Sequence, residues 1–139
     1  MALKDFRVLL RSRMNALGFH EHVDAFDDQN IPQTTLDKTY VMDSAVTDPA
    51  LVGQIQYEFG NNIDLKIYLA GGRDNVDLVD RAHDVADTVL ADILQTDVRL
   101  GADVIDIEHT TLTIAPYSAS DDNDLVLTLG FTGKVICAF

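Results

Sequence analysis

Cysteine, tryptophan and long apolar runs are scarce or missing in this chain. The single cysteine, Cys137, excludes an internal disulfide and suits a reducing compartment. The longest apolar runs are far too short to span a membrane, and we expect neither a membrane segment nor a secretory signal peptide. A chain of 139 residues with 47% hydrophobic residues is long enough to form one domain, residues 1–139, around a core of its own.

Positive charge is scarce as well. The formal net charge is −13, only four residues are lysine, and 20 of the 23 acidic residues are aspartate. Such a surface repels nucleic acid, which argues against sequence-specific DNA or RNA binding. Three interpretations stay open: a channel wall along which DNA slides without sticking, a host that lives at high salt, and an ordinary acidic soluble protein.

The few basic residues are unevenly placed. Lys4, Arg7, Arg11 and Arg13 lie within the first 13 positions, whereas residues 71–139 hold 13 acidic residues against four basic ones. A basic helix and an acidic remainder could meet across a subunit boundary. The alternative is that the basic stripe is the solvated face of the first helix.

The first half of the chain predicts one helix and one strand. Apolar residues at helical spacing predict a helix over 3–17, which Gly18 ends. Residues 19–36 have no clear period and are predicted to form a loop or a loosely extended segment. A strand is predicted over 39–45, and a turn or mobile loop over 46–51.

The middle of the chain predicts a hairpin and then a long helix. Apolar residues alternate with polar ones on both sides of Gly60-Asn61-Asn62, which is the predicted turn, and Gly71-Gly72 ends the second strand. Asp74 or Asn75 can cap the helix that follows. Its predicted apolar face consists of Val76, Val79, Ala86, Leu90 and Ile93.

The last third predicts two more strands, over 104–116 and 125–139, joined by a polar, solvent-exposed loop over 118–124. Gly130 and Gly133 are predicted to place a bulge or bend in the last strand. The natural solution is an α+β fold: a mostly antiparallel sheet with two amphipathic helices packed on one face, in the order α-β-β(-β)-α-β-β.

Two acidic or histidine-rich clusters could suggest metal sites. His20-Glu21-His22 with Asp24 has no further ligand nearby in the sequence, and neighbouring histidines separated by one residue point to opposite sides of an extended chain. The run 121–124 lacks the ligand spacing, central glycine and distal glutamate of a calcium loop. We therefore expect no metal.

Catalytic and phosphate-binding patterns are weak. Gly71-Gly72 precedes a helix N-terminus, but Asp74, Asp77 and Asp80 would repel an anion there. The serines have no adjacent histidine, and no G-x-S-x-G motif is present. We expect neither an enzyme nor a bound cofactor.

Across most of its length the chain resembles the lambda-type tail terminator proteins of long-tailed bacteriophages, also called tail completion or minor tail proteins. The resemblance lies in an N-terminal amphipathic helix, the strand 39–45, and the strand 63–69 running into Gly71-Gly72 and a long helix. A final strand pair with an aspartate-rich loop between them completes the pattern. Size and acidity also fit.

The resemblance implies a structural role in the virion, assembled in the host cytoplasm. Such proteins form a six-membered ring on the last ring of the tail tube, stop its polymerisation and present the surface that joins the neck of the filled head, while DNA passes through the centre. Alternatives are another neck or head-completion protein, a tube-related virion protein, or a cytoplasmic small-molecule-binding α+β domain. The last would need a pocket with convergent polar groups.

The partners implied are further copies of the chain, the tail tube protein and a neck protein, with no membrane. Exposed sheet edges, such as 39–45 or the C-terminal strand, could pair with a neighbouring subunit. Loops carry function when a rigid sheet positions them, so 48–53 and the 121–124 tip are expected to reach partners. The candidate interface residues are Lys4, Arg7, Arg11, Asp48, Leu51, Asp121, Asp122 and Asp124.

Overall fold

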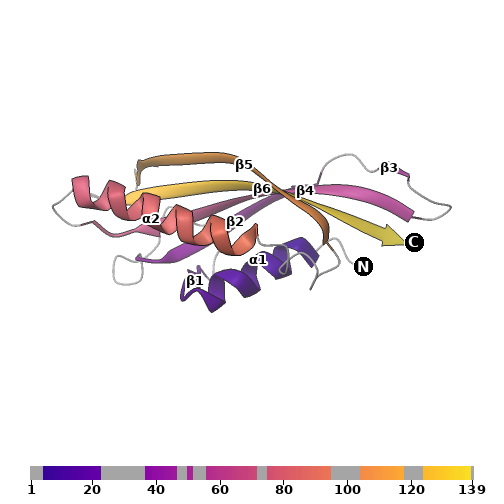
Figure 1. The fold of residues 1–139 in the computed structure, drawn as a ribbon, viewed down its shortest axis with the longest axis horizontal. Coiled ribbons are helices and arrows are strands. Elements are labelled where there is room, and N and C mark those ends of the chain that lie inside the picture. The colour runs from indigo at the N-terminus through magenta and orange to yellow at the C-terminus, as the bar shows by residue number, and fades with distance from the viewer. Residues whose placement is uncertain are drawn as a thin grey trace.

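The computed structural model describes residues 5–22, 37–46, 50–51, 56–71, 75–94, 104–117 and 124–138. These stretches form two helices and one mostly antiparallel sheet, which confirms the predicted α+β class (Figure 1). The sheet order is β1-β2-β4-β6-β5, with β3 paired to β4. The elements are α1 (Asp5–Ala16), β1 (His20–Glu21), β2 (Thr39–Val46), β3 (Ala50–Leu51), β4 (Gln56–Leu69), α2 (Asn75–Ile93), β5 (Val104–Pro116) and β6 (Leu125–Ala138).

Helix α1 forms because its apolar residues recur every fourth position. Phe6, Leu10 and Met14 are buried against the sheet, as the predicted helix requires. The helix ends at Gly18, whose φ of 90° lies in the left-handed region that favours glycine, and whose backbone N–H donates to the carbonyl of Asn15.

The predicted hairpin turn at Gly60-Asn61-Asn62 is wrong. Strand β4 runs through these residues without a turn, and each of them pairs with β6. The alternation of apolar residues supports one strand, because Tyr57, Phe59 and Ile63 all occupy odd positions and the phase never breaks. Pairing with a 14-residue partner strand on one side overrides the local turn preference of glycine and asparagine.

Helix α2 confirms the predicted long helix but buries a different stripe. Val79, predicted on the apolar face, is 37% exposed, whereas Ala86 and Ile93 are buried as expected. Val79 follows Leu78 by one position, which turns it about 100° away from the sheet. The buried stripe is Leu78, Ala82, Ala86, Val89 and Ile93.

Both helices cover the same face of the sheet, as predicted (Figure 1). On that face the odd-numbered residues of the central strands are buried, including Leu65 of β4 and Leu129 of β6. On the opposite face a smaller cluster forms from Val41, Tyr68 and Tyr117, with the two tyrosine rings 4.9 Å apart. No helix in the described stretches is both long and apolar enough to cross a membrane.

The predicted bulge lies in the neighbouring strand. The pairing of β5 with β6 shifts between Val104 and Asp106 and again between His109 and Thr111, so the extra residues belong to β5 rather than β6. Gly130 of β6 faces the second bulge. A Cβ atom there would meet the hydroxyl oxygens of Thr110 and Thr111, which would have to rotate to admit it.

The segments predicted as loops or loosely extended chain contain two short strands and one buried carboxylate. The stretch 19–36 includes β1, which pairs in parallel with the start of β2, and the stretch 46–51 includes β3. Asp124, predicted in a solvent-exposed loop, is only 1% exposed, and its side chain accepts a hydrogen bond from the backbone N–H of Gly71 at 3.1 Å. Residues 118–123 of that loop lie outside the described stretches.

Candidate subunit interface

The predicted interface residues fall into three groups. Lys4, Asp48, Asp121 and Asp122 lie outside the described residues, as does Asp24 of the histidine cluster. Leu51 lies in β3, which pairs with β4 through Tyr57. Of the remainder, Asp124 is buried, and Arg7 and Arg11 are partly exposed on α1. Of the predicted interface residues that the structure describes, Arg7 and Arg11 are the two that lie together.

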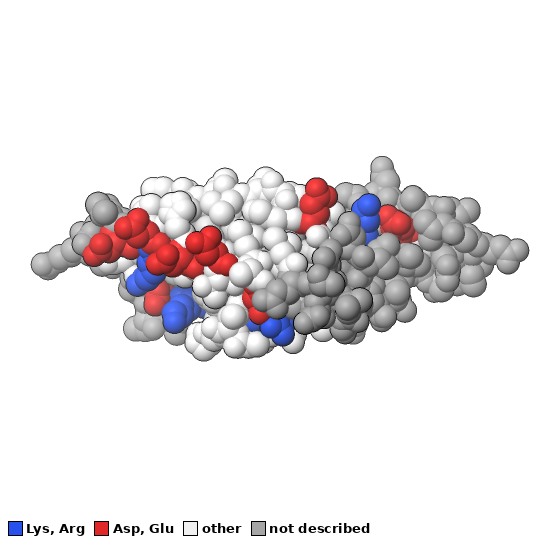
Figure 2. All heavy atoms as spheres, in the orientation of Figure 1, with Lys and Arg blue, Asp and Glu red and all other residues white. Residues whose placement is uncertain are grey.

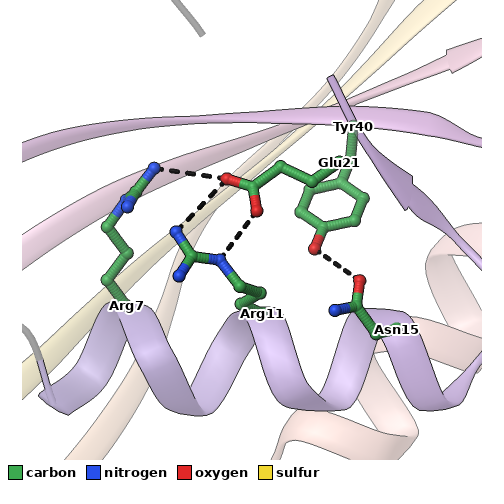
Figure 3. A network of polar contacts seen from close by, with 5 residues as sticks. All are labelled: Arg7, Arg11, Asn15, Glu21 and Tyr40. Carbon is green, nitrogen blue, oxygen red and sulfur yellow. Dashed lines mark hydrogen bonds and ion pairs between the residues drawn. The ribbon is translucent and has the colours of Figure 1, made fainter. Parts of the chain in front are cut away.

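Both arginines bind a carboxylate of their own chain (Figure 3). Arg11 Nε donates to Glu21 Oε2 at 2.7 Å, and Arg7 donates to Glu21 Oε1 at 3.3 Å. The three side chains remain between 24% and 36% exposed. Glu21 thus fixes the basic stripe against β1, and each guanidinium retains further donors for a second acceptor.

The same cluster includes Tyr40, the residue that pairs with Glu21 across β1 and β2. Its hydroxyl donates to Asn15 Oδ1 at 2.8 Å (Figure 3). Burial, reinforced by the negative charge of Glu21 and opposed by Arg11 and Arg7, raises the pKa of Tyr40 to about 12. The tyrosine therefore stays neutral and packs α1 on the sheet.

A second ion pair joins the two helices. Arg13 of α1 donates two hydrogen bonds to Asp92 of α2, at 2.8 and 2.5 Å. The hydrogen bonds that Arg13 donates to Asp92, and then the negative charge of Asp92, raise the pKa of Arg13 above its ordinary value. The basic stripe is therefore divided: Arg7 and Arg11 face β1, and Arg13 faces α2.

The exposed face of α2 carries a row of carboxylates. Asp77, Asp80, Asp84 and Asp87 are all exposed and recur at spacings of three and four residues, which places them along one side of the helix. Figure 2 shows acidic side chains gathered in a row over α2. The sequence prediction covers only the aspartates of the first two turns. A helical-wheel projection of residues 75–93 is the signal that predicts the whole row.

The histidines do not gather into a metal site in the part of the chain described. No group of three or more potential metal ligands is present there, and Glu21 of the histidine cluster is bound to the arginines. His83 and His109 lie on different elements. The Nδ1 atom of His83 contacts the backbone carbonyl of Val79, and that of His109 contacts the carbonyl of Gly130.

Of the two strands predicted to be sheet edges, 39–45 and the C-terminal strand, the C-terminal strand is not an edge. The C-terminal strand β6 is central, with β4 on one side and β5 on the other, because it pairs with both along most of its length. The outer side of β2 pairs with β1 only at Thr39 and Tyr40. The opposite edge of the described sheet is β5, which the sequence did not single out.

No family model matches the chain, and no curated protein matches it.

Proposed function

We propose that this protein is a structural component of a phage virion that forms a ring on the end of the tail tube. In this role it stops polymerisation of the tube, offers its other surface to the neck or head-completion protein, and leaves a central channel for DNA. The role is that of a tail terminator. It requires contacts with further copies of the chain and with two different partners, and it requires no chemistry.

The observation that carries this proposal is the arrangement of the sheet. Two helices cover one face, and the described lateral edges, β2 and β5, are both left largely unpaired. A domain with two different open edges can associate side by side, and a head-to-tail contact of this kind closes into a ring when the rotation per subunit divides the circle. Any open sheet has two edge strands, and an unprotected edge is a template for pairing with another chain.

The charge of the chain agrees with DNA passage. Binding to the DNA backbone depends on basic residues that release counterions, and this chain has a net charge of −13. The acidic row on α2 adds a continuous surface that repels phosphate. A ring built from such subunits would let DNA slide without adhering to it.

A small-molecule-binding domain is the competing function. A depression of about 220 Å³ lies beside the start of α2, lined by Gly71, Asp77, Leu78 and Arg81. The Arg81 guanidinium already donates to Asp37 at 3.0 Å and to the carbonyl of Ala70 at 2.6 Å. One nitrogen of the guanidinium, Nη2, is therefore engaged within the chain, which leaves fewer polar groups in this depression for orienting a ligand.

Electron microscopy of the purified protein, at low and at high salt, tests the proposal. Class averages with six-fold symmetry and an open centre are the expected result, and added tail tubes should acquire one such ring at a single end. If the protein stays monomeric even with tube ends present, and tubes continue to grow in its presence, the proposal is wrong.

A further inference from the structure

We infer that neighbouring copies in the ring join by strand addition: β5 of one copy pairs antiparallel with β2 of the next. This inference rests on the proposed ring function and names the contact that would build it. The partner is a second copy of this chain, and the two surfaces are the outer edge of β5 and the outer edge of β2 beyond Tyr40.

Strand β5 is an edge strand whose outer side could pair with another chain. Its inner side pairs with β6 along nearly its full length, and among the described residues no strand pairs with its outer side. Edge strands are commonly protected by charged side chains or proline; in β5 the charges, Asp106 and Glu108, lie in the first half, and the stretch 110–115 carries neither. Leu112 in this stretch is 41% exposed, although it lies on the face of the sheet that the helices cover.

Strand β2 presents the second edge. Strand β1 covers only its first two residues, so the backbone from Val41 to Val46 has no described strand on its outer side. Asp43 is the one charged side chain in this segment, and Lys66 of the same chain already binds it at 2.8 Å. The open segment therefore presents a nearly neutral edge.

Strand direction favours this contact. The long strands β2, β4, β6 and β5 alternate in direction, because each adjacent pair is antiparallel. Strands β2 and β5 therefore run in opposite senses. A neighbour generated by rotation about an axis roughly along the strands keeps its own strand directions, so its β2 meets β5 antiparallel, and the alternation continues across the boundary.

The register across the sheet places compatible residues together. Following the pairing from β2 through β4 and β6 to β5 sets Met42 level with Leu112, and Asp43 level with Thr111. A neighbour added at the same level brings the exposed Leu112 beside Met42 of the next copy. It also places Asp43 opposite a neutral threonine, so no like charges face each other.

A pair of lysine substitutions tests the contact. Leu112→Lys places a charge on the β5 edge, and we expect it to abolish rings while leaving the urea midpoint of the monomer nearly unchanged. Val79→Lys is the matched control, because Val79 is 37% exposed but lies on helix α2 rather than on a strand. Rings that persist in Leu112→Lys overturn the inference.

Cross-linking provides a second measurement that does not depend on loss of assembly. Rings of the double variant Thr111→Cys/Asp43→Cys, oxidised with copper phenanthroline, should give a denaturant-resistant ladder of multimers. The unaltered chain, which carries only Cys137, is the control. Covalent dimers from Thr111→Cys alone would indicate a two-fold β5–β5 contact and overturn the inference, as would oxidised rings without a ladder.

These outcomes separate the inference from the function on which it rests. Rings without the ladder, or rings in Leu112→Lys, leave the ring-forming function standing and reject only the β5–β2 contact. Failure of the unaltered protein to form rings, alone and with tail tubes, rejects the proposed function and the contact together.

Discussion

The ring of Phe6 in α1 lies directly over the backbone of Gly133 in β6. A Cβ atom at position 133 would lie 2.5 Å from the Cγ and Cδ2 atoms of that ring, closer than any real carbon contact. Glycine at this position therefore sets how closely α1 approaches the sheet. Because Phe6 is fully buried, its ring has little space into which it could move.

Gly133→Ala is expected to destabilise the fold by about 1–3 kcal/mol, the usual cost of adding atoms to a packed core. The measurement is the free energy of unfolding from urea titration. Gly130→Ala is the matched control in the same strand, since its added methyl group meets the hydroxyl oxygens of two exposed threonines, which can rotate away. Equal losses in the two variants would show that Phe6 does not restrict position 133.

Stability at high pH is expected to depend on Tyr40. The pKa of this tyrosine is about 12 in the folded protein and near 10 in an unfolded chain. The folded state therefore holds the phenolic proton more tightly. The stabilisation is complete below pH 10 and is lost as the pH rises through about 12.

Tyr40→Phe separates this contribution from the other titrating groups. At neutral pH the variant should lose about 1 kcal/mol, because the hydrogen bond to Asn15 is removed. Between pH 10 and 12 its stability should fall less than that of the unaltered protein. Denaturation curves at several pH values measure both effects, and parallel curves for the two proteins would contradict the prediction.

Salt dependence of stability is expected from the acidic row on α2. Asp84 has like charges four residues before it, at Asp80, and three residues after it, at Asp87. Asp84→Lys turns two repulsions into attractions and should stabilise the monomer by roughly 0.5–1 kcal/mol at low salt. The gain should vanish in concentrated NaCl, and Asp84→Asn should give about half of it. A gain that does not change with salt would point to helix propensity instead.

Periodicity predicted most of the fold, and it failed where two local signals disagreed. The α+β class, both helices and the last two strands follow from the spacing of apolar residues. At Gly60-Asn61-Asn62 the turn preference of glycine and asparagine predicts a hairpin. In the structure these residues continue the strand in the same phase as Tyr57 and Leu69. Pairing with β6, about 70 residues away in sequence, and of Asn61 and Asn62 with β2 keeps these residues extended.

The candidate site was less predictable because its contacts join distant parts of the chain. The pairing of Arg13 with Asp92 spans 79 positions, and nothing local indicates it. Burial of Asp124 likewise depends on Gly71, which is 53 positions away. Composition and local pattern locate charged side chains on elements. They do not reveal which of those charges already have a partner within the chain.

The predicted role of Arg7 and Arg11 in subunit contact now requires a sharper test, because Glu21 of the same chain binds both. Charge reversal at either arginine breaks an internal ion pair, so a loss of assembly alone would not identify an intersubunit contact. Each of these partly exposed ion pairs contributes little to the stability of the fold, typically under about 1 kcal/mol.

Exchanging the charges resolves the two roles. Arg11→Glu should lower both the urea midpoint of the monomer and the yield of rings. Arg11→Glu/Glu21→Arg should restore the midpoint in part, because the pair with position 11 is re-formed with opposite sense while Arg7 then faces an arginine. If Arg11 also binds an acidic residue of a neighbouring copy, rings stay depleted in the double variant, since the reversed charge now repels that residue. We expect this outcome, measured by counting rings in electron micrographs at matched concentration. Full recovery of rings would confine Arg11 to its own chain and leave the open sheet edges as the source of subunit contact.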